Sequence, residues 1–195
     1  GTLKEGVYAK DLALWIIGMI GSSGANYMSM EFHGKGVGSL GISDRMTLAN
    51  LASEMGAKNA VFPADEILFN YLNIKESPKA LWADDDAEYT RIINIHLEDV
   101  YPLVAHPHHV DKVKAVAESE GIPVQQGLIG TCTNGRIEDL RITAKILEHQ
   151  RIADGFQLLV IPASKEIYLQ AMKEGILEKL INSGATLLSS SCGPC

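Results

Sequence analysis

Residues 123–150 read PVQQGLIGTCTNGRIEDLRITAKILEHQ. The opening run, 123–130, is a short segment with apolar residues between proline and glycine, so it predicts a strand. Residues 136–150 predict a helix, because acidic residues occupy the first turn and apolar residues recur at helical spacing. The residues expected to face inward are Ile137, Leu140, Ala144 and Leu147. Between the strand and the helix lies a turn of small residues that carries Cys132.

The same alternation continues towards the end of the chain. Apolar runs predict further strands over 156–162 and 185–190, and helical patterns fill 164–175 and 176–184, with a break at Gly175. Strands that alternate with helices form parallel sheets with right-handed crossovers. We therefore predict an α/β fold in which helices flank parallel or mixed sheets.

The three cysteines of the chain are expected at one edge of this sheet. Cys132 follows the first strand, and Cys192 and Cys195 follow the third. Because the carboxyl ends of parallel strands meet at one edge, the three thiols can converge without a special bend. The helix that follows Cys132 would also favour its thiolate form. Thiolates bind iron and zinc, so the sequence predicts a metal centre at this edge.

The number of cysteines bears on the kind of centre. A closed structural zinc site has four protein ligands, whereas three thiolates on an iron–sulfur cluster leave one iron open to a substrate hydroxyl. The spacing alone leaves a redox-active pair, a partial zinc site and surface thiols without a role as alternatives. A structural zinc site would need a fourth ligand such as His106, which lies in the histidine-rich segment AHPHHV at 105–110. That segment could also bind a divalent ion, but an exposed, proline-interrupted loop is the more common reading.

In the first half, residues 43–56 predict an amphipathic helix. Ser43 is the expected N-cap and Gly56 the stop signal. The expected buried face consists of Leu48, Leu51, Ala52 and Met55. Thr47, Asn50 and Glu54 fall on the opposite face, since residues three and four apart stack along a helix. From the pattern alone, this polar face would simply meet solvent.

Composition limits the partners and the location. The 195 residues are 46% hydrophobic and carry a formal net charge of −7, which argues against nucleic acid or an anionic membrane as a partner. The longest apolar stretch, 12–20, is too short to span a bilayer, so we expect a cytoplasmic protein. An acidic, proline-bearing stretch at 76–90 suggests a connection between two subdomains, 1–88 and 89–195. Because the chain begins just before a helix and stops on a cysteine, we expect a fragment of a longer protein.

Three motifs resemble the aconitase superfamily. They are EFHGKGVGSLGISDRMTLANLASEMGA at 31–57, IGTCTNGRIEDLRITAKIL at 129–147 and SCGPC at 191–195. The resemblance covers nearly the whole chain and is greatest to the large-subunit branch of the 3-isopropylmalate dehydratase and homoaconitase type. It implies two aconitase-like α/β subdomains, the first carrying Asn50 and Glu54 and the second carrying the cysteines.

The resemblance also implies a cofactor and a reaction. Cys132, Cys192 and Cys195 would hold a [4Fe–4S] cluster whose fourth iron binds substrate. Asn50 and Glu54 match an Asn and a Glu that face this cluster in the family pattern, with Glu54 as the proton partner. The implied enzyme is a hydro-lyase that isomerises a hydroxy acid by dehydration and rehydration. The substrate pair would be 3-isopropylmalate and 2-isopropylmalate in leucine biosynthesis, with homocitrate and citrate as alternatives.

Other parts of the family pattern bear on binding and on partners. Asn134 and Arg136, beside Cys132, are further candidates for binding a substrate carboxylate. The family's swivelling domain has no counterpart in the chain, so the resemblance implies a separate small subunit and an incomplete catalyst without it. A different class of function stays open, that of a non-catalytic metal-binding or iron-sensing module; the lack of basic clusters argues against RNA as its partner.

Overall fold

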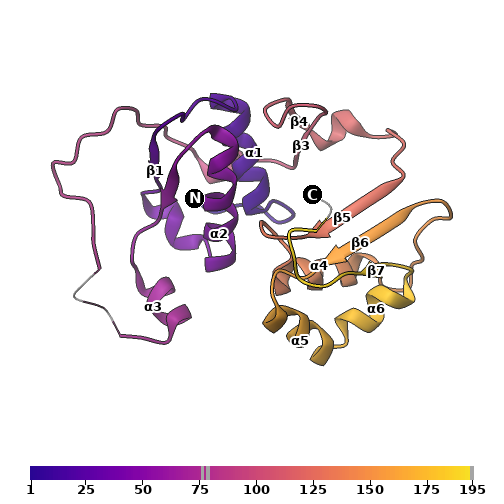
Figure 1. Cartoon of the computed structure of the whole chain (residues 1–195). Helices are drawn as coiled ribbons and strands as arrows, with labels where there is room; N and C mark the ends of the chain where they lie inside the picture. The colour runs from indigo at the N-terminus through magenta and orange to yellow at the C-terminus, as the bar shows by residue number, and fades with distance from the viewer. Residues whose placement is uncertain (76, 78–79, 194–195) are drawn as a thin grey trace. The chain divides into compact units, whose positions relative to one another are not determined.

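The chain folds into two compact units, Gly1–Glu120 and Gly121–Cys195 (Figure 1). The structure, a computed structural model, describes residues 1–75, 77 and 80–193. It contains helices together with parallel and antiparallel strands, which confirms the expected α/β fold class. Within the described residues, no helix combines the length and the apolar character that a membrane crossing requires.

The first unit combines helices with two small sheets. Strands β1 (Ser29–Glu31) and β2 (Asn59–Val61) pair in parallel, and strands β3 (Leu103–Ala105) and β4 (Val113–Ala115) pair antiparallel. The helices are α1 (Ala9–Ile20), α2 (Ile42–Leu51) and α3 (Glu66–Leu72). Short 3-10 segments are η1 (Lys35–Ser39), η2 (Ala52–Met55), η3 (Leu97–Asp99) and η4 (Val116–Ser119). Helix α1 contacts α2, β3 and β4, so it lies at the centre of the unit.

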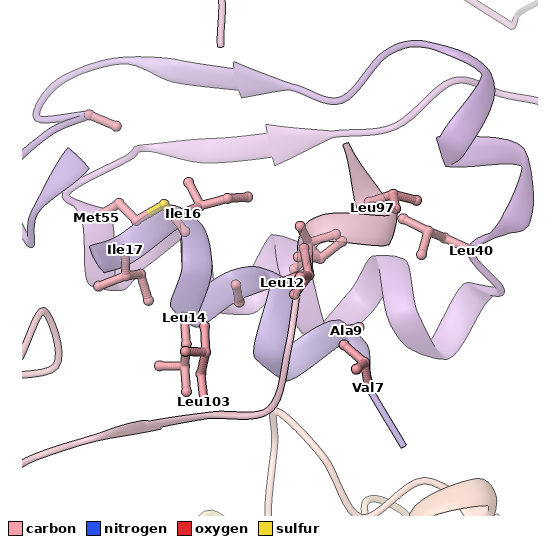
Figure 2. Close-up of a cluster of buried hydrophobic side chains, with 14 residues drawn as sticks. Val7, Ala9, Leu12, Leu14, Ile16, Ile17, Leu40, Met55, Leu97 and Leu103 are labelled. Carbon is pink, nitrogen blue, oxygen red and sulfur yellow. The ribbon is translucent and has the colours of Figure 1, made fainter. Parts of the chain in front are cut away.

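The core of the first unit is built around α1 (Figure 2). This helix buries Ala9, Leu12, Ala13, Ile16 and Ile17, which form one continuous helical face. Figure 2 shows this face among side chains from distant segments, including Leu40, Met55, Leu97 and Leu103. The Asp11 carboxylate fixes the start of the helix, since one oxygen accepts the Tyr8 N–H at 2.8 Å. Its other oxygen accepts the Leu103 N–H at 2.8 Å and so ties β3 to α1.

The boundary between the compact units lies later than the division that the sequence suggested. The sequence placed its division after residue 88, in the acidic stretch. In the structure, residues 97–119 belong to the first unit, because Leu97, Val100 and Leu103 are buried in the core around α1. Asn50 and Glu54 are therefore part of a unit that extends to residue 120.

The helix expected over 43–56 is present in two parts, α2 and η2. It ends at Gly56, whose φ of 83° is left-handed. The predicted N-cap was wrong: Gly41 holds this position rather than Ser43, and the Gly41 N–H donates to the Asp44 carboxylate at 2.9 Å. The Asp44 carboxylate thus satisfies the backbone N–H of the N-cap residue, as the acidic residue at N3 of a capping box does. Of the expected apolar face, Leu48, Ala52 and Met55 are buried and Leu51 is half-buried.

A buried ion pair fixes α2 within the first unit. The Arg45 side chain is only 5% exposed, and its guanidinium donates to both oxygens of the Asp65 carboxylate, at 2.8 and 2.6 Å. It also donates to the carbonyl oxygens of Leu40 at 3.1 Å and Val37 at 3.2 Å. Asp65 in turn caps α3 by accepting the Leu68 N–H at 3.2 Å. The guanidinium lowers the pKa of the Asp65 carboxyl, and the pair ties η1, α2 and α3 together.

The second unit, as far as it is described, is a three-stranded parallel sheet with helices packed on it (Figure 1). The strands β5 (Gln126–Gly130), β6 (Gln157–Ile161) and β7 (Thr186–Leu187) lie in that order, with β6 in the middle. The helices are α4 (Ile137–Ile146), α5 (Lys165–Lys173) and α6 (Ile176–Asn182). Their apolar faces meet β6 in a core that contains Leu140, Val160, Ala171 and Leu180. The parallel sheet predicted from the alternating pattern is confirmed, with slightly shorter elements.

Candidate metal centre

The turn that carries Cys132 is held against the end of β6. Thr131, directly before the cysteine, donates its N–H to the Ile161 carbonyl at 3.1 Å. Gly135 has a φ of 85°, and a Cβ at this position would come within 2.6 Å of the same carbonyl oxygen, so only glycine fits there. Thr131 is buried and also left-handed, with a φ of 72°. A β-branched residue in this conformation is strained, and such strain persists mostly where a functional site requires it.

Asp139, in the first turn of α4, organises the rest of this turn. Its Oδ2 accepts the backbone N–H groups of Gly135 at 3.0 Å and Arg136 at 2.9 Å. Its Oδ1 accepts the side-chain amide of Asn134 at 3.5 Å. Asp139 thus satisfies the backbone N–H groups of the two residues that precede the helix, which begins at Ile137.

The segment after β7 returns to the same turn. The Leu188 N–H donates to the Val160 carbonyl at 2.9 Å, so the chain stays beside β6. Farther on, Gly193 packs against the Ile161 side chain at the end of β6. A Cβ on Gly193 would lie 3.7 Å from the Thr131 Cγ2 atom. The end of β6 is thus bridged by segments from both of its neighbouring strands.

This arrangement brings two of the predicted ligands to one edge. Cys132 follows Thr131 and Cys192 precedes Gly193, and these two neighbours lie close together, so both cysteines are at the carboxyl end of the sheet. Both are exposed. Cys195, the third predicted ligand, lies outside the described residues. Among residues 1–75, 77 and 80–193, no three His, Cys, Asp or Glu side chains are grouped to hold a metal ion.

Unpartnered polar atoms gather at the same edge. In the described part of the chain, the buried side-chain nitrogen and oxygen atoms without a hydrogen-bond partner are Asn134 Oδ1, Arg136 Nε and Ser190 Oγ. The first two belong to the Cys132 turn, and Ser190 lies shortly before Cys192. A buried polar atom without a partner is unfavourable by about 1–3 kcal/mol, so such atoms are rare and indicate a missing partner. The sulfur donors and these atoms together fit a metal centre with a polar ligand.

Sequence reasoning missed Ser190. It is the middle residue of the run Ser189–Ser191, and residue type alone does not separate the three serines. Asn134 and Arg136 were predicted from their position beside Cys132, and the structure adds which of their atoms lack partners.

Asn50 and Glu54, the predicted catalytic pair, lie in the first unit. Both are exposed, Asn50 near the end of α2 and Glu54 in η2. Thr47, expected beside them, is 2% exposed, so its assignment to the polar face was wrong. Its hydroxyl donates to the Ser43 carbonyl at 3.0 Å, a bond within the helix that satisfies a threonine without solvent.

Within the described residues, the histidine segment 105–110 takes part in no group of three metal-ligating side chains. His106 Nε2 lies 2.7 Å from the Ser119 hydroxyl. A different polar group lies at the end of β1. Glu31 Oε2 accepts the Tyr89 hydroxyl at 2.6 Å and lies 2.8 Å from His33 Nε2. The hydrogen bond from Tyr89 is the largest cause that lowers the pKa of Glu31, and the interaction with His33 is the second. The Glu31 carboxylate in turn raises the pKa of Tyr89.

Comparison with known proteins finds the same family along the whole chain. The sequence profile of the Aconitase family (aconitate hydratase) matches residues 1–120 and 114–195. The 3-isopropylmalate dehydratase large subunits of Lachnoclostridium phytofermentans and Clostridium kluyveri are each 47% identical over 100% of the chain. A probable 3-isopropylmalate dehydratase large subunit of Methanothermobacter thermautotrophicus is 43% identical over the same extent. The match covers 47% of each of these proteins, so the chain spans about half the length of the curated relatives it matches.

Proposed function

Because the chain belongs to the aconitase family, we propose that it is part of the iron–sulfur large subunit of a hydro-lyase. The reaction is the isomerisation of 3-isopropylmalate to 2-isopropylmalate by dehydration and rehydration, a step in leucine biosynthesis. The names of its relatives support this substrate. The structural observation that carries the proposal is the meeting of the Cys132 turn and the Cys192 segment at the end of β6.

Cys132, Cys192 and Cys195 are the proposed ligands of a [4Fe–4S] cluster. Held by three thiolates, this cluster supplies an open iron position that polarises the C–O bond of a substrate hydroxyl. Exposure of Cys132 and Cys192 supports the proposal, since their sulfur atoms must be free to bind the cluster and the substrate must be able to approach it.

The polar atoms beside Cys132 suit the two functional groups of a hydroxy acid. Arg136 Nε–H is a buried donor without an acceptor, and a substrate carboxylate would provide one. Asn134 Oδ1 is a buried acceptor without a donor, and a substrate hydroxyl would provide one. Asp139 sets the direction of this amide, because a carboxylate can bind only its NH₂ group. Asn134 and Arg136 would therefore bind and orient the substrate.

Asn50 and Glu54 supply the remaining proposed groups. Glu54 is the proton partner of the substrate hydroxyl or of water, and Asn50 donates a hydrogen bond beside it. A separate small subunit completes the catalyst, and its existence is supported by the description of the relatives as large subunits. The assembled enzyme would act in the cytoplasm.

Anaerobic reconstitution with iron and sulfide tests the cluster directly. We expect a brown protein with broad visible absorption and about four irons per chain, and a colourless Cys132→Ser variant. Tight binding of one zinc ion, with no colour after reconstitution, would instead support a structural zinc site.

A second experiment tests the substrate. The full-length large subunit and its small subunit are compared on isopropylmalate, homocitrate and citrate. We expect turnover of isopropylmalate only when both subunits are present. A higher kcat/KM for homocitrate would reassign the enzyme to the homoaconitase reaction.

A further inference from the structure

We propose that Ser190 is a positioning residue of the metal centre, whose buried hydroxyl donates a hydrogen bond to a cysteine sulfur there. The inference rests on the proposed cluster and adds a residue that holds and tunes it without being a ligand. It starts from the run Ser189–Ser191, which leads from β7 to Cys192.

The two outer serines are joined to each other in the loop, through the Ser191 hydroxyl and the Ser189 backbone. Ser191 donates its hydroxyl to the Ser189 carbonyl at 3.2 Å and accepts the Gly193 N–H at 3.1 Å. Both outer serines are exposed. Ser190 differs, because its Oγ is closed off from solvent and has no hydrogen-bond partner in the described part of the chain. The middle hydroxyl therefore contributes nothing to the turn that its neighbours build.

The position of the loop indicates where the missing partner lies. Between Leu188, which is bonded to β6, and Gly193, which packs on Ile161 and faces Thr131, the chain crosses the carboxyl end of the sheet. Ser190 lies within this crossing, two residues before Cys192. Its hydroxyl thus belongs to the same edge as the two described cysteines.

The chemistry of the hydroxyl suits a sulfur partner. A serine hydroxyl always has a proton to donate and carries no charge of its own. Hydrogen bonds to ligand sulfurs stabilise the additional electron of a reduced cluster and thereby raise its reduction potential. Exclusion of solvent around Oγ strengthens such a bond, because the local dielectric is low.

Two measurements on Ser190→Ala test the proposal, with Ser191→Ala as the matched control. The first is the free energy of unfolding of the metal-free protein. Ser190→Ala should be as stable as the wild type or more stable, since it removes an unpartnered group, whereas Ser191→Ala should be less stable because it loses two bonds.

The second measurement is the midpoint potential of the reconstituted protein, followed in a spectroscopic redox titration. Ser190→Ala should lower the equilibrium constant for reduction about tenfold, and so lower the midpoint potential by about 59 mV for a one-electron reduction. Ser190→Thr, which keeps the hydroxyl, should restore the wild-type potential, and Ser191→Ala should not move it.

Several results would overturn the inference. If Ser190→Ala destabilises the metal-free protein as much as Ser191→Ala does, the hydroxyl has a structural partner in the chain. An unchanged potential in Ser190→Ala would mean that the hydroxyl binds internal water or substrate, and only the role of Ser190 would fall. A wild-type protein that takes up no cluster would refute the proposed function itself, and the role of Ser190 with it.

Discussion

Removing the charge of Asp65 should destabilise the first unit more than removing any comparable surface charge. Asp65→Asn keeps the size of the side chain and the ability to cap α3, but leaves the Arg45 guanidinium without a counter-charge. Loss of one partner from a buried pair is unfavourable by about 3–5 kcal/mol. The Arg45 side chain is 5% exposed but that of Asp65 is 26% exposed, so we expect the lower end of this range, about 3 kcal/mol.

The second unit provides a control with the same chemistry on the surface. Arg141 and Glu174 form a pair with two hydrogen bonds, at 2.8 and 2.7 Å, but their side chains are 49% and 32% exposed. Glu174→Gln should therefore lower stability by only about 0.2–1 kcal/mol. Urea unfolding followed by far-UV circular dichroism separates the two outcomes, because about 3 kcal/mol moves the midpoint by roughly 1.5 M. Equal midpoints for Asp65→Asn and Glu174→Gln would refute a buried, stabilising role for the Arg45 pair.

Acid unfolding shows how the stabilisation by the Arg45–Asp65 pair depends on pH. Arg45 lowers the pKa of Asp65 in the folded state, so the stabilisation is fully present above the unfolded-state pKa of about 3.9. It is lost as the pH falls through the lower folded-state value. Asp65→Asn has no such group to protonate, and its stability should fall less steeply than that of the wild type in this pH range.

Other variants test the proposed site and its surroundings. Gly135→Ala should abolish iron uptake, because its Cβ would collide with the backbone of β6; Gly155→Ala, at a similar φ of 83° but with open space around it, is the control and should retain iron. Equal iron content in both would contradict a steric requirement in the Cys132 turn. Glu54→Gln should lower kcat by roughly 100-fold or more while the cluster absorption is unchanged, and undiminished turnover would remove Glu54 from the mechanism. Tyr89→Phe should raise the pKa of Glu31 towards its ordinary value in an NMR titration, since the Tyr89 hydroxyl bond is the main cause of its lowered pKa.

The second unit could be predicted from the sequence because its signals are local. Each strand is a short apolar run, and each helix carries its own start or stop signal. Ser164 caps α5 by accepting the Ile167 N–H at 3.2 Å, and Gly175 separates α5 from α6 in a left-handed conformation. Once the strands were identified, the parallel topology placed Cys132 and Cys192 at one edge.

The features that the sequence did not predict depend on contacts between distant residues or on choices between similar ones. Residues 97–119 join the first unit through side chains buried against α1 and through the Leu103 bond to Asp11, 92 positions earlier. Residue type favoured Ser43 as the start of α2, but the helix begins after Gly41, whose N–H donates to the Asp44 carboxylate. Burial of a single hydroxyl among three successive serines likewise has no local signature.

The glycines beside the cysteines follow from the order of the strands. Since β6 lies between β5 and β7, a loop from either outer strand must pass over the end of β6 to reach the other. The fully buried Ile161 forms that end, and a Cβ at Gly135 or at Gly193 would collide with it. A side chain at either glycine would collide with Ile161 and keep the two loops apart. Small residues are therefore needed where the loops cross β6, but not at the cysteines themselves. The glycines in the cysteine motifs are therefore explained by the position of β6 in the middle of the sheet, whereas the cysteines are explained by the proposed metal binding.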